Sequence, residues 1–209
     1  LLGVFLPFLT LYILFFLNNK IYSKNQLEEL NLPISIVSEI PEINDQSNTT
    51  ILSSTERSPL AESFRVLASN LKFFKDQSKN SAEVIMLTST IKGEGKTFCA
   101  VNLSYTLSSL GKKVLLIGAD LHNPQIHSYL NIEKNVNGLS TFLLNDKVNW
   151  KNFLMKPQTS IDCDILVGGA IPPNPAQLLN NGSFNKLISE AKKSYDYIII
   201  DTPPSLLVS

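Results

Sequence analysis

The stretch Val84-Ile-Met-Leu-Thr-Ser-Thr-Ile-Lys-Gly-Glu-Gly-Lys-Thr97 decides the fold that we expect for this chain. It begins with a short apolar run of β-forming residues and passes through a loop that carries Gly93 and Gly95. An amphipathic helical pattern then opens at Lys96 and runs to about Gly111. This order of strand, loop and helix is the context of a phosphate-binding loop, and an ordinary turn with a chance Gly-x-Gly is the alternative.

Each part of such a loop has a physical task. Glycines let backbone N–H groups close around phosphate oxygens, and the helix that follows presents its positive dipole end to the same anion. Lys96 is expected to reach the β- and γ-phosphates, and the Thr97 hydroxyl to bind Mg²⁺. One position departs from the common GxxxxGK(S/T) pattern, because Thr90 stands in place of the first glycine.

The bulk composition excludes some classes of partner. Eighteen basic and eighteen acidic residues cancel over 209 residues, so no global charge indicates nucleic acid binding. Cys99 and Cys163 form neither a Cys-x-x-Cys pair nor a metal-ligand pattern with the histidines. We therefore predict that both cysteines are reduced and serve as small core residues.

The first seventeen residues contain no charge and approach the ~20 residues that cross a bilayer. Lys20 and Lys24 follow this run, which favours a cytoplasmic location for the chain after it. A signal peptide or a buried core helix is the alternative, but the run has neither a basic leader nor a polar stripe. Because the chain has no initiator Met and begins inside the run, we expect residues 1–19 to be a transmembrane helix truncated at its start.

Residues 20–58 are expected to form a juxtamembrane linker, with a short helix near residues 24–32 and a polar, flexible part from residue 44 onward. A helical pattern resumes at Pro59 and predicts a core-facing stripe of Leu60, Phe64, Leu67, Leu71 and Phe74. On its polar side, Glu62 and Arg65 form either a solvated pair or a contact to a neighbouring subunit.

Three further apolar runs follow the loop and its helix, at residues 114–117, 165–167 and 197–200. Helical segments fit between them, notably at residues 141–144 and 184–193. Continuous apolarity is typical of parallel strands that are covered on both faces. The sequence therefore predicts an α/β domain of residues 59–209, a P-loop NTPase with a parallel β-sheet flanked by helices.

Two carboxylates follow strands of this predicted sheet. Asp201 ends the fourth run, where a buried charge is costly unless a cation such as nucleotide-bound Mg²⁺ meets it; capping of the next turn is the alternative. Asp120 follows the second run and has the same two interpretations, because Asn123-Pro124 is itself a turn signal. Ligands of parallel sheets lie beyond the carboxyl ends of strands, where both aspartates are expected.

Taken together, these motifs resemble the bacterial tyrosine kinases joined to polysaccharide co-polymerases, a family of membrane proteins that serve capsule and exopolysaccharide export. The loop is similar to the family's Ser-x-x-Pro-Gly-Glu-Gly-Lys-(Ser/Thr), with Lys92 in the proline position. The other similar segments are the aspartate motif at residues 116–124, the Walker B strand at residues 197–204, the segment at residues 168–179 and the membrane exit at residues 32–41.

Three departures from the family pattern stand out. Gly118 replaces the first aspartate of the second motif, and His122 replaces the arginine two places after Asp120. The family's oligomerisation helix reads Glu-x-x-Arg-x-x-Arg, where Glu62 and Arg65 match and Ala68 replaces the last arginine.

The resemblance implies transfer of the ATP γ-phosphoryl group to tyrosines of neighbouring copies, by an autokinase of the bacterial inner membrane whose kinase domain is cytoplasmic. It implies Lys96, Asp120 and Asp201 as catalytic residues, with Thr97, Asp120 and Asp201 around Mg²⁺. The expected nucleotide-binding residues are Lys92, Gly93, Glu94, Gly95, Lys96, Thr97 and Phe98. The expected partners are further copies of the chain through Glu62 and Arg65, the membrane and the polysaccharide export machinery, without nucleic acid. The family's tyrosine-rich tail would lie beyond Ser209.

Two other functions fit parts of the same pattern. A partition or positioning ATPase shares the fold, but its signature lysine, five residues before the loop lysine, is Ile91 in this chain. Alternatively, ATP binding only orders an assembly that regulates polysaccharide chain length, a possibility that Gly118 leaves open.

Overall fold

The computed structural model describes residues 2–18, 20–43, 56–74, 81–130, 132–156 and 163–207. The chain divides into two compact units, Leu1–Glu39 and Ile40–Ser209. Most of the predicted flexible segment, residues 44–55, lies outside the described residues.

The described residues of the first unit form the helices α1 (Leu2–Phe16) and α2 (Lys24–Glu29). The side chains described in α1, from Phe5 onward, are exposed. They are apolar or aromatic except for Thr10, whose hydroxyl donates a hydrogen bond to the Leu6 carbonyl. The helix α2 begins where the Ser23 hydroxyl accepts a hydrogen bond from the Gln26 N–H. Within the described residues, no helix combines the length and apolarity that crossing a membrane would require.

Among its described residues, the second unit contains four strands, β1 (Glu83–Leu87), β2 (Val114–Gly118), β3 (Cys163–Leu166) and β4 (Tyr197–Asp201). They form one parallel sheet in the order β1-β4-β2-β3. Asp201 lies opposite Leu87 on one side and opposite Gly118 on the other, so three strands end at the same level. The four predicted strands and their parallel arrangement are confirmed.

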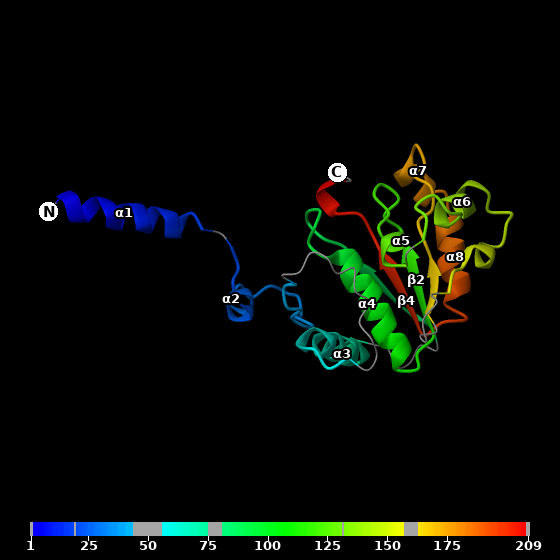
Figure 1. Cartoon of the computed structure of the whole chain (residues 1–209), viewed down its shortest axis with the longest axis horizontal. Helices are drawn as coiled ribbons and strands as arrows, with labels where there is room; N and C mark the ends of the chain where they lie inside the picture. Colours follow the sequence, from blue (N-terminus) through cyan, green and yellow to red (C-terminus); the bar gives the residue numbers. More distant parts are fainter. Residues whose placement is uncertain are drawn as a thin grey trace. The chain divides into compact units, whose positions relative to one another are not determined.

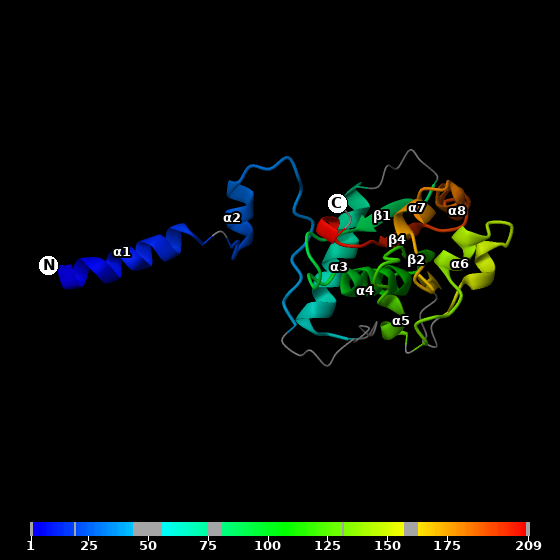
Figure 2. The same cartoon turned by 90° about the horizontal axis from the view of Figure 1, so that it is seen from above.

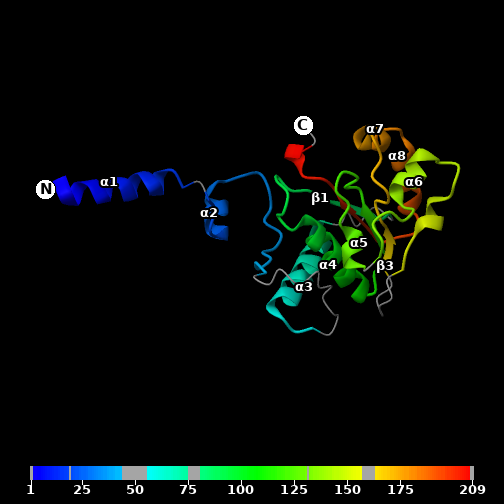
Figure 3. The same ribbon diagram turned by 45° about the horizontal axis from the view of Figure 1, so that its top comes forward.

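Helices cover the sheet on two faces, as Figures 1 and 2 show. The α-helices of this unit are α3 (Pro59–Leu71), α4 (Lys96–Ser109), α5 (Ile126–Tyr129), α6 (Leu139–Leu144), α7 (Pro175–Leu179) and α8 (Ser183–Ala191). Short 3₁₀ turns are η1 (Lys72–Phe74), η2 (Trp150–Phe153) and η3 (Ser205–Leu207). Figure 3 shows α3, α4 and α5 on one side of the strands and α6, α7 and α8 on the other.

Alternate residues of the strands supply two apolar cores, as the period of two in a strand requires. On the face of α3 and α4, Leu116 packs in one cluster with Phe64 and Ala100. On the face of α6 and α8, Leu115 packs with Phe142 and Leu187. Both cysteines are free, and Cys163 is buried in the first cluster, as predicted.

The predicted apolar stripe of α3 is confirmed as far as Leu71, but the prediction for Phe74 is wrong. The side chain of Phe74 is 57% exposed, whereas Phe64 is fully buried. The reason is local, because the α-helix ends at Leu71 and the tighter turn η1 no longer keeps the spacing of 3.6 residues.

Candidate active site

The loop between β1 and α4 has the shape that a phosphate-binding loop requires. Gly93 and Gly95 have φ angles of +94° and +84°, which side chains other than glycine rarely adopt. A Cβ at either position would meet nothing within 4 Å, so the requirement for glycine is conformational rather than steric. The helix α4 begins at Lys96, and its first N–H groups and positive dipole end therefore face the loop.

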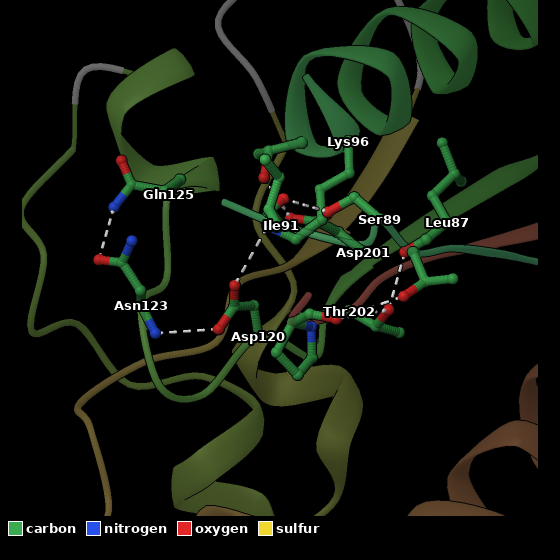
Figure 4. Close-up of polar contacts among 12 residues, drawn as sticks. Leu87, Ser89, Ile91, Lys96, Asp120, Asn123, Gln125, Asp201 and Thr202 are labelled. Atoms are coloured by element: carbon green, nitrogen blue, oxygen red, sulfur yellow. Dashed lines mark hydrogen bonds and ion pairs between the residues drawn. The ribbon is translucent and has the colours of Figure 1, made fainter. Parts of the chain in front are cut away.

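Lys96 is held at the carboxyl edge of the sheet by Asp120. The Lys96 Nζ lies 3.4 Å from the Asp120 Oδ2, and both side chains are nearly buried, at 10% and 5% exposed (Figure 4). A cation shielded in this way is attracted to anionic oxygens more strongly than a surface lysine is. The structure thus brings together two of the predicted catalytic residues.

Asp120 also shapes the turn that follows it. Its Oδ1 accepts a hydrogen bond of 2.9 Å from the Asn123 N–H, and the Gln125 side chain donates to the Asn123 amide oxygen (Figure 4). The turn interpretation of Asp120 is therefore correct. Because its second oxygen meets Lys96, Asp120 combines this structural task with a place in the site.

Thr97 and Asp201 form the second polar contact of the site. The Thr97 hydroxyl donates a hydrogen bond of 2.8 Å to the Asp201 Oδ2. Burial raises the pKa of Asp201 to about 6, and the negative charge of Asp120 adds to this, while the Thr97 hydrogen bond and Lys96 act in the opposite direction. The Asp201 Oδ1 is buried and has no hydrogen-bond partner among the described residues.

These groups fit a magnesium ion that arrives with a nucleotide. No group of three or more His, Cys, Asp or Glu side chains within the described residues could hold a metal by itself. Mg²⁺ typically takes one or two carboxylates and completes its shell with water and substrate phosphates. The unpartnered oxygen of Asp201, the Asp120 carboxylate and the Thr97 hydroxyl are ligands of that kind.

The remaining predicted residues lie at different places. Lys92 and Glu94 are exposed on the loop. The ring of Phe98 packs edge to face on Phe64 of α3, at 5.8 Å between centroids, so only its backbone is available to the loop. Nucleotide binding by these residues stays a prediction.

Glu62 and Arg65 bind each other within α3. The Arg65 Nη1 lies 3.0 Å from the Glu62 Oε2, and Arg65 also donates to the Glu56 carbonyl. Their contact to a neighbouring subunit stays a prediction too.

The sequence profile of the AAA domain family matches residues 82–209, which include the loop, both aspartates and the strands β1 to β4. The chain belongs to this AAA domain family.

Two named relatives of the chain are tyrosine-protein kinases. A putative tyrosine-protein kinase in the cps region of Klebsiella pneumoniae is 36% identical over 207 residues, covering 92% of this chain and 28% of that protein. The tyrosine-protein kinase YwqD of Bacillus subtilis is 38% identical over 161 residues, covering 76% of this chain and 65% of that protein. The chain thus spans less than two thirds of either relative.

The solved kinase domain of the Escherichia coli tyrosine kinase ETK matches 88% of this chain and 73% of that chain, with a TM-score of 0.77 and 28% identity. The resemblance to bacterial tyrosine kinases that the motifs indicated is confirmed.

Two features of the AAA domain site were not predicted from the sequence. The segment after β4 is bonded to the loop, since the Ser205 N–H donates to the Ser89 carbonyl at 2.8 Å and the Leu206 N–H to the Thr90 carbonyl at 3.3 Å. Thr202 begins this contact, with both its N–H and its hydroxyl on the Leu87 carbonyl (Figure 4). The only signal in the sequence is Pro203-Pro204, which favours an extended backbone after Thr202.

His127 was also missed. It lines a small cavity together with Asp120, Lys134 and Asp201, and burial lowers the pKa of its imidazole, with the charge of Lys134 adding to this. Nothing in the sequence marked this histidine, because its neighbours in the cavity come from four separate segments.

Proposed function

We propose that this chain is the catalytic part of an ATP-dependent protein-tyrosine autokinase that regulates the polymerisation and export of capsule or exopolysaccharide. The observation that carries the proposal is the gathering of Lys96, Thr97, Asp120 and Asp201 at one edge of the sheet, beside a loop shaped for phosphate. The tyrosine-kinase names of the relatives and of the solved domain support the choice of acceptor.

The roles follow from the contacts. Lys96 and the loop amides bind the phosphates, so Lys96 exchanges its partner Asp120 for the β- and γ-phosphate oxygens. Asp120 is then free to accept the proton of the tyrosine hydroxyl, whose oxygen bonds to the γ-phosphorus while the bond to the leaving ADP breaks. Thr97 and Asp201 hold Mg²⁺. When bound, Mg²⁺ neutralises charge on the phosphates.

Gly118 favours one second candidate, an ATP-binding switch that orders an assembly without transferring a phosphoryl group. Gly118 lies opposite Asp201 in the sheet, so the carboxylate that the family usually places there is missing beside the metal site. A positioning ATPase has less support, since Ile91 stands in its lysine position and the named relatives are tyrosine kinases.

The surroundings of the kinase are part of the proposal. Residues 59–209 form the kinase domain, residues 20–58 a cytoplasmic linker, and residues 1–19 belong to a membrane-spanning segment of the inner membrane. The uncharged, exposed side chains of α1 support this placement. Neighbouring copies, which contact the chain through Glu62 and Arg65, supply the acceptor tyrosines. One relative is named for the cps region, which supports a link to polysaccharide machinery.

The test measures phosphotyrosine on a synthetic tyrosine-containing peptide and on the protein itself, with ATP and Mg²⁺. Lys96→Ala is expected to lower the rate by roughly 100-fold or more, since it removes the cation that binds the transferred group. Lys112→Ala, an exposed lysine beyond the other end of α4, is the control and is expected to keep the full rate.

Phosphotyrosine that forms equally in the Lys96→Ala protein would contradict the proposal. Nucleotide-dependent oligomerisation without phosphotyrosine, followed by sedimentation, would instead support the assembly switch.

A further inference from the structure

Glu94 is exposed, but its side chain makes hydrogen bonds within the phosphate-binding loop. Its side chain is turned back onto the loop, where the Oε2 accepts hydrogen bonds from the Thr90 N–H at 2.8 Å and the Ile91 N–H at 3.2 Å. One carboxylate oxygen thus joins the fifth residue of the phosphate-binding pattern to the first two.

From these contacts we infer that Glu94 is a positioning residue, whose side-chain oxygen keeps the phosphate-binding loop in its nucleotide-binding shape by accepting two hydrogen bonds from the backbone of the loop. This inference rests on the proposed nucleotide site.

The Glu94 carboxylate contacts the start of the loop and is not the partner of Lys96. Lys96 is paired with Asp120, from the segment after β2, at 3.4 Å. The two amides that Glu94 binds precede the glycines, so the N–H groups between Gly93 and Thr97 stay available for phosphate oxygens. Glu94 therefore stabilises the loop without occupying the part that binds the ligand.

The loop needs such support because glycines make it conformationally free. Gly93 and Gly95 flank Glu94, and each ordered glycine costs more backbone entropy than other residues do. The start of the loop is fixed on its other side by Ser205 and Leu206, whose N–H groups bond to the Ser89 and Thr90 carbonyls. Glu94 extends this fixed region toward the glycines, so that less entropy is lost when the phosphates bind.

The first experiment compares the affinity of ADP and ATP for three versions of the protein. Glu94→Ala removes both hydrogen bonds and is expected to weaken ADP and ATP by the same factor, roughly three- to tenfold, since it acts on the shape of the loop. Glu94→Gln keeps an oxygen that can accept both N–H groups and is expected to restore most of the affinity. Glu83→Ala, at the amino end of β1, is the charge control and is expected to bind like the unmutated protein.

The second readout needs no nucleotide. Hydrogen exchange of the Thr90 and Ile91 amides in the free protein is expected to accelerate several-fold in Glu94→Ala and to stay slow in Glu94→Gln. Unchanged exchange in Glu94→Ala would overturn the inference, as would a Gln variant that behaves like the Ala variant. If the unmutated protein binds neither nucleotide, the proposed function fails, and amide exchange still decides whether Glu94 orders the loop.

Discussion

At the scale of single residues, Asp201 links the site to stability and pH. Its folded-state pKa of about 6 is above the ordinary value of 3.8, so the folded protein binds this proton more tightly than the unfolded chain. The ionised carboxylate therefore costs stability above pH 6. That cost shrinks as the pH falls through 6 and is gone below about pH 4, where both states are protonated.

We predict that Asp201→Asn makes the nucleotide-free protein more stable at pH 7.5, by on the order of 1–2 kcal/mol, because it removes a buried charge. The gain should decrease when urea unfolding is repeated at pH 5. The same variant should lose Mg²⁺-dependent ATP binding, which isothermal titration calorimetry measures.

Glu133→Gln, which changes an exposed carboxylate, is the control and should alter stability by less than about 0.5 kcal/mol. An Asp201→Asn protein that is less stable than the unmutated one at pH 7.5 would show that the Thr97 hydrogen bond outweighs the cost of burial.

Gly118 stands where the family usually has an aspartate, but the atoms packed around Gly118 leave no room for a side chain. A Cβ at this position would lie 2.9 Å from the Gly168 nitrogen and 3.2 Å from the Ile126 Cδ1. We predict that Gly118→Ala lowers the free energy of unfolding by about 1–3 kcal/mol, since the end of β2 and the segment after β3 must move apart. Urea denaturation measures the change. We expect Gly118→Asp to share this loss, and a variant with undiminished stability and faster phosphotyrosine formation would refute the steric argument.

At the scale of elements, the sequence predicted which segments are strands better than it predicted which elements lie next to one another in the fold. Residues 114–117 and 197–200 are continuously apolar because β2 and β4 are buried on both faces, so the sequence alone indicates central strands. The place of β4 between β1 and β2 depends on pairing across more than seventy residues, which no local pattern records. The same holds for the contact of Ser205 with Ser89.

In the candidate site, too, some features could be predicted from the sequence and others could not. Lys96 and Thr97 were predictable because their roles follow from spacing within one loop. Glu94 was assigned to the nucleotide, but its hydrogen bonds to the loop follow from a rotamer that spacing does not fix. Gly118 was recognised as a lost carboxylate, whereas its close approach to Gly168 depends on the packing of β2 against the segment after β3, which is distant in sequence.

The helix α3 yields a prediction about the missing arginine of the oligomerisation pattern. Ala68 stands in that place and is fully buried in the core cluster that contains Phe64. An arginine there would bury a charge without a partner, so we predict that Ala68→Arg destabilises the domain by about 3 kcal/mol or more. Val66→Arg, on the same helix but 44% exposed, should cost less than about 1 kcal/mol. Thermal unfolding of the two variants side by side tests this, and equal melting temperatures would mean that α3 can turn position 68 outward.

At the scale of the whole molecule, the described site residues and both apolar cores belong to the unit Ile40–Ser209. Ile40 packs against the apolar core that contains Phe64, so a shortened chain that keeps this core should begin at Ile40. We therefore predict that a chain of residues 40–209 unfolds cooperatively and binds ADP with the affinity of the 209-residue chain, because it retains the loop, α4 and both aspartates. The apolar side chains of α1 are exposed, so only the longer chain should float with phospholipid vesicles in a density gradient. Calorimetry with ADP and vesicle flotation, run on both chains, separate the two claims. A shorter chain that still floats would assign membrane binding to the AAA domain, and one that no longer binds ADP would mean that the first unit contributes to the nucleotide site.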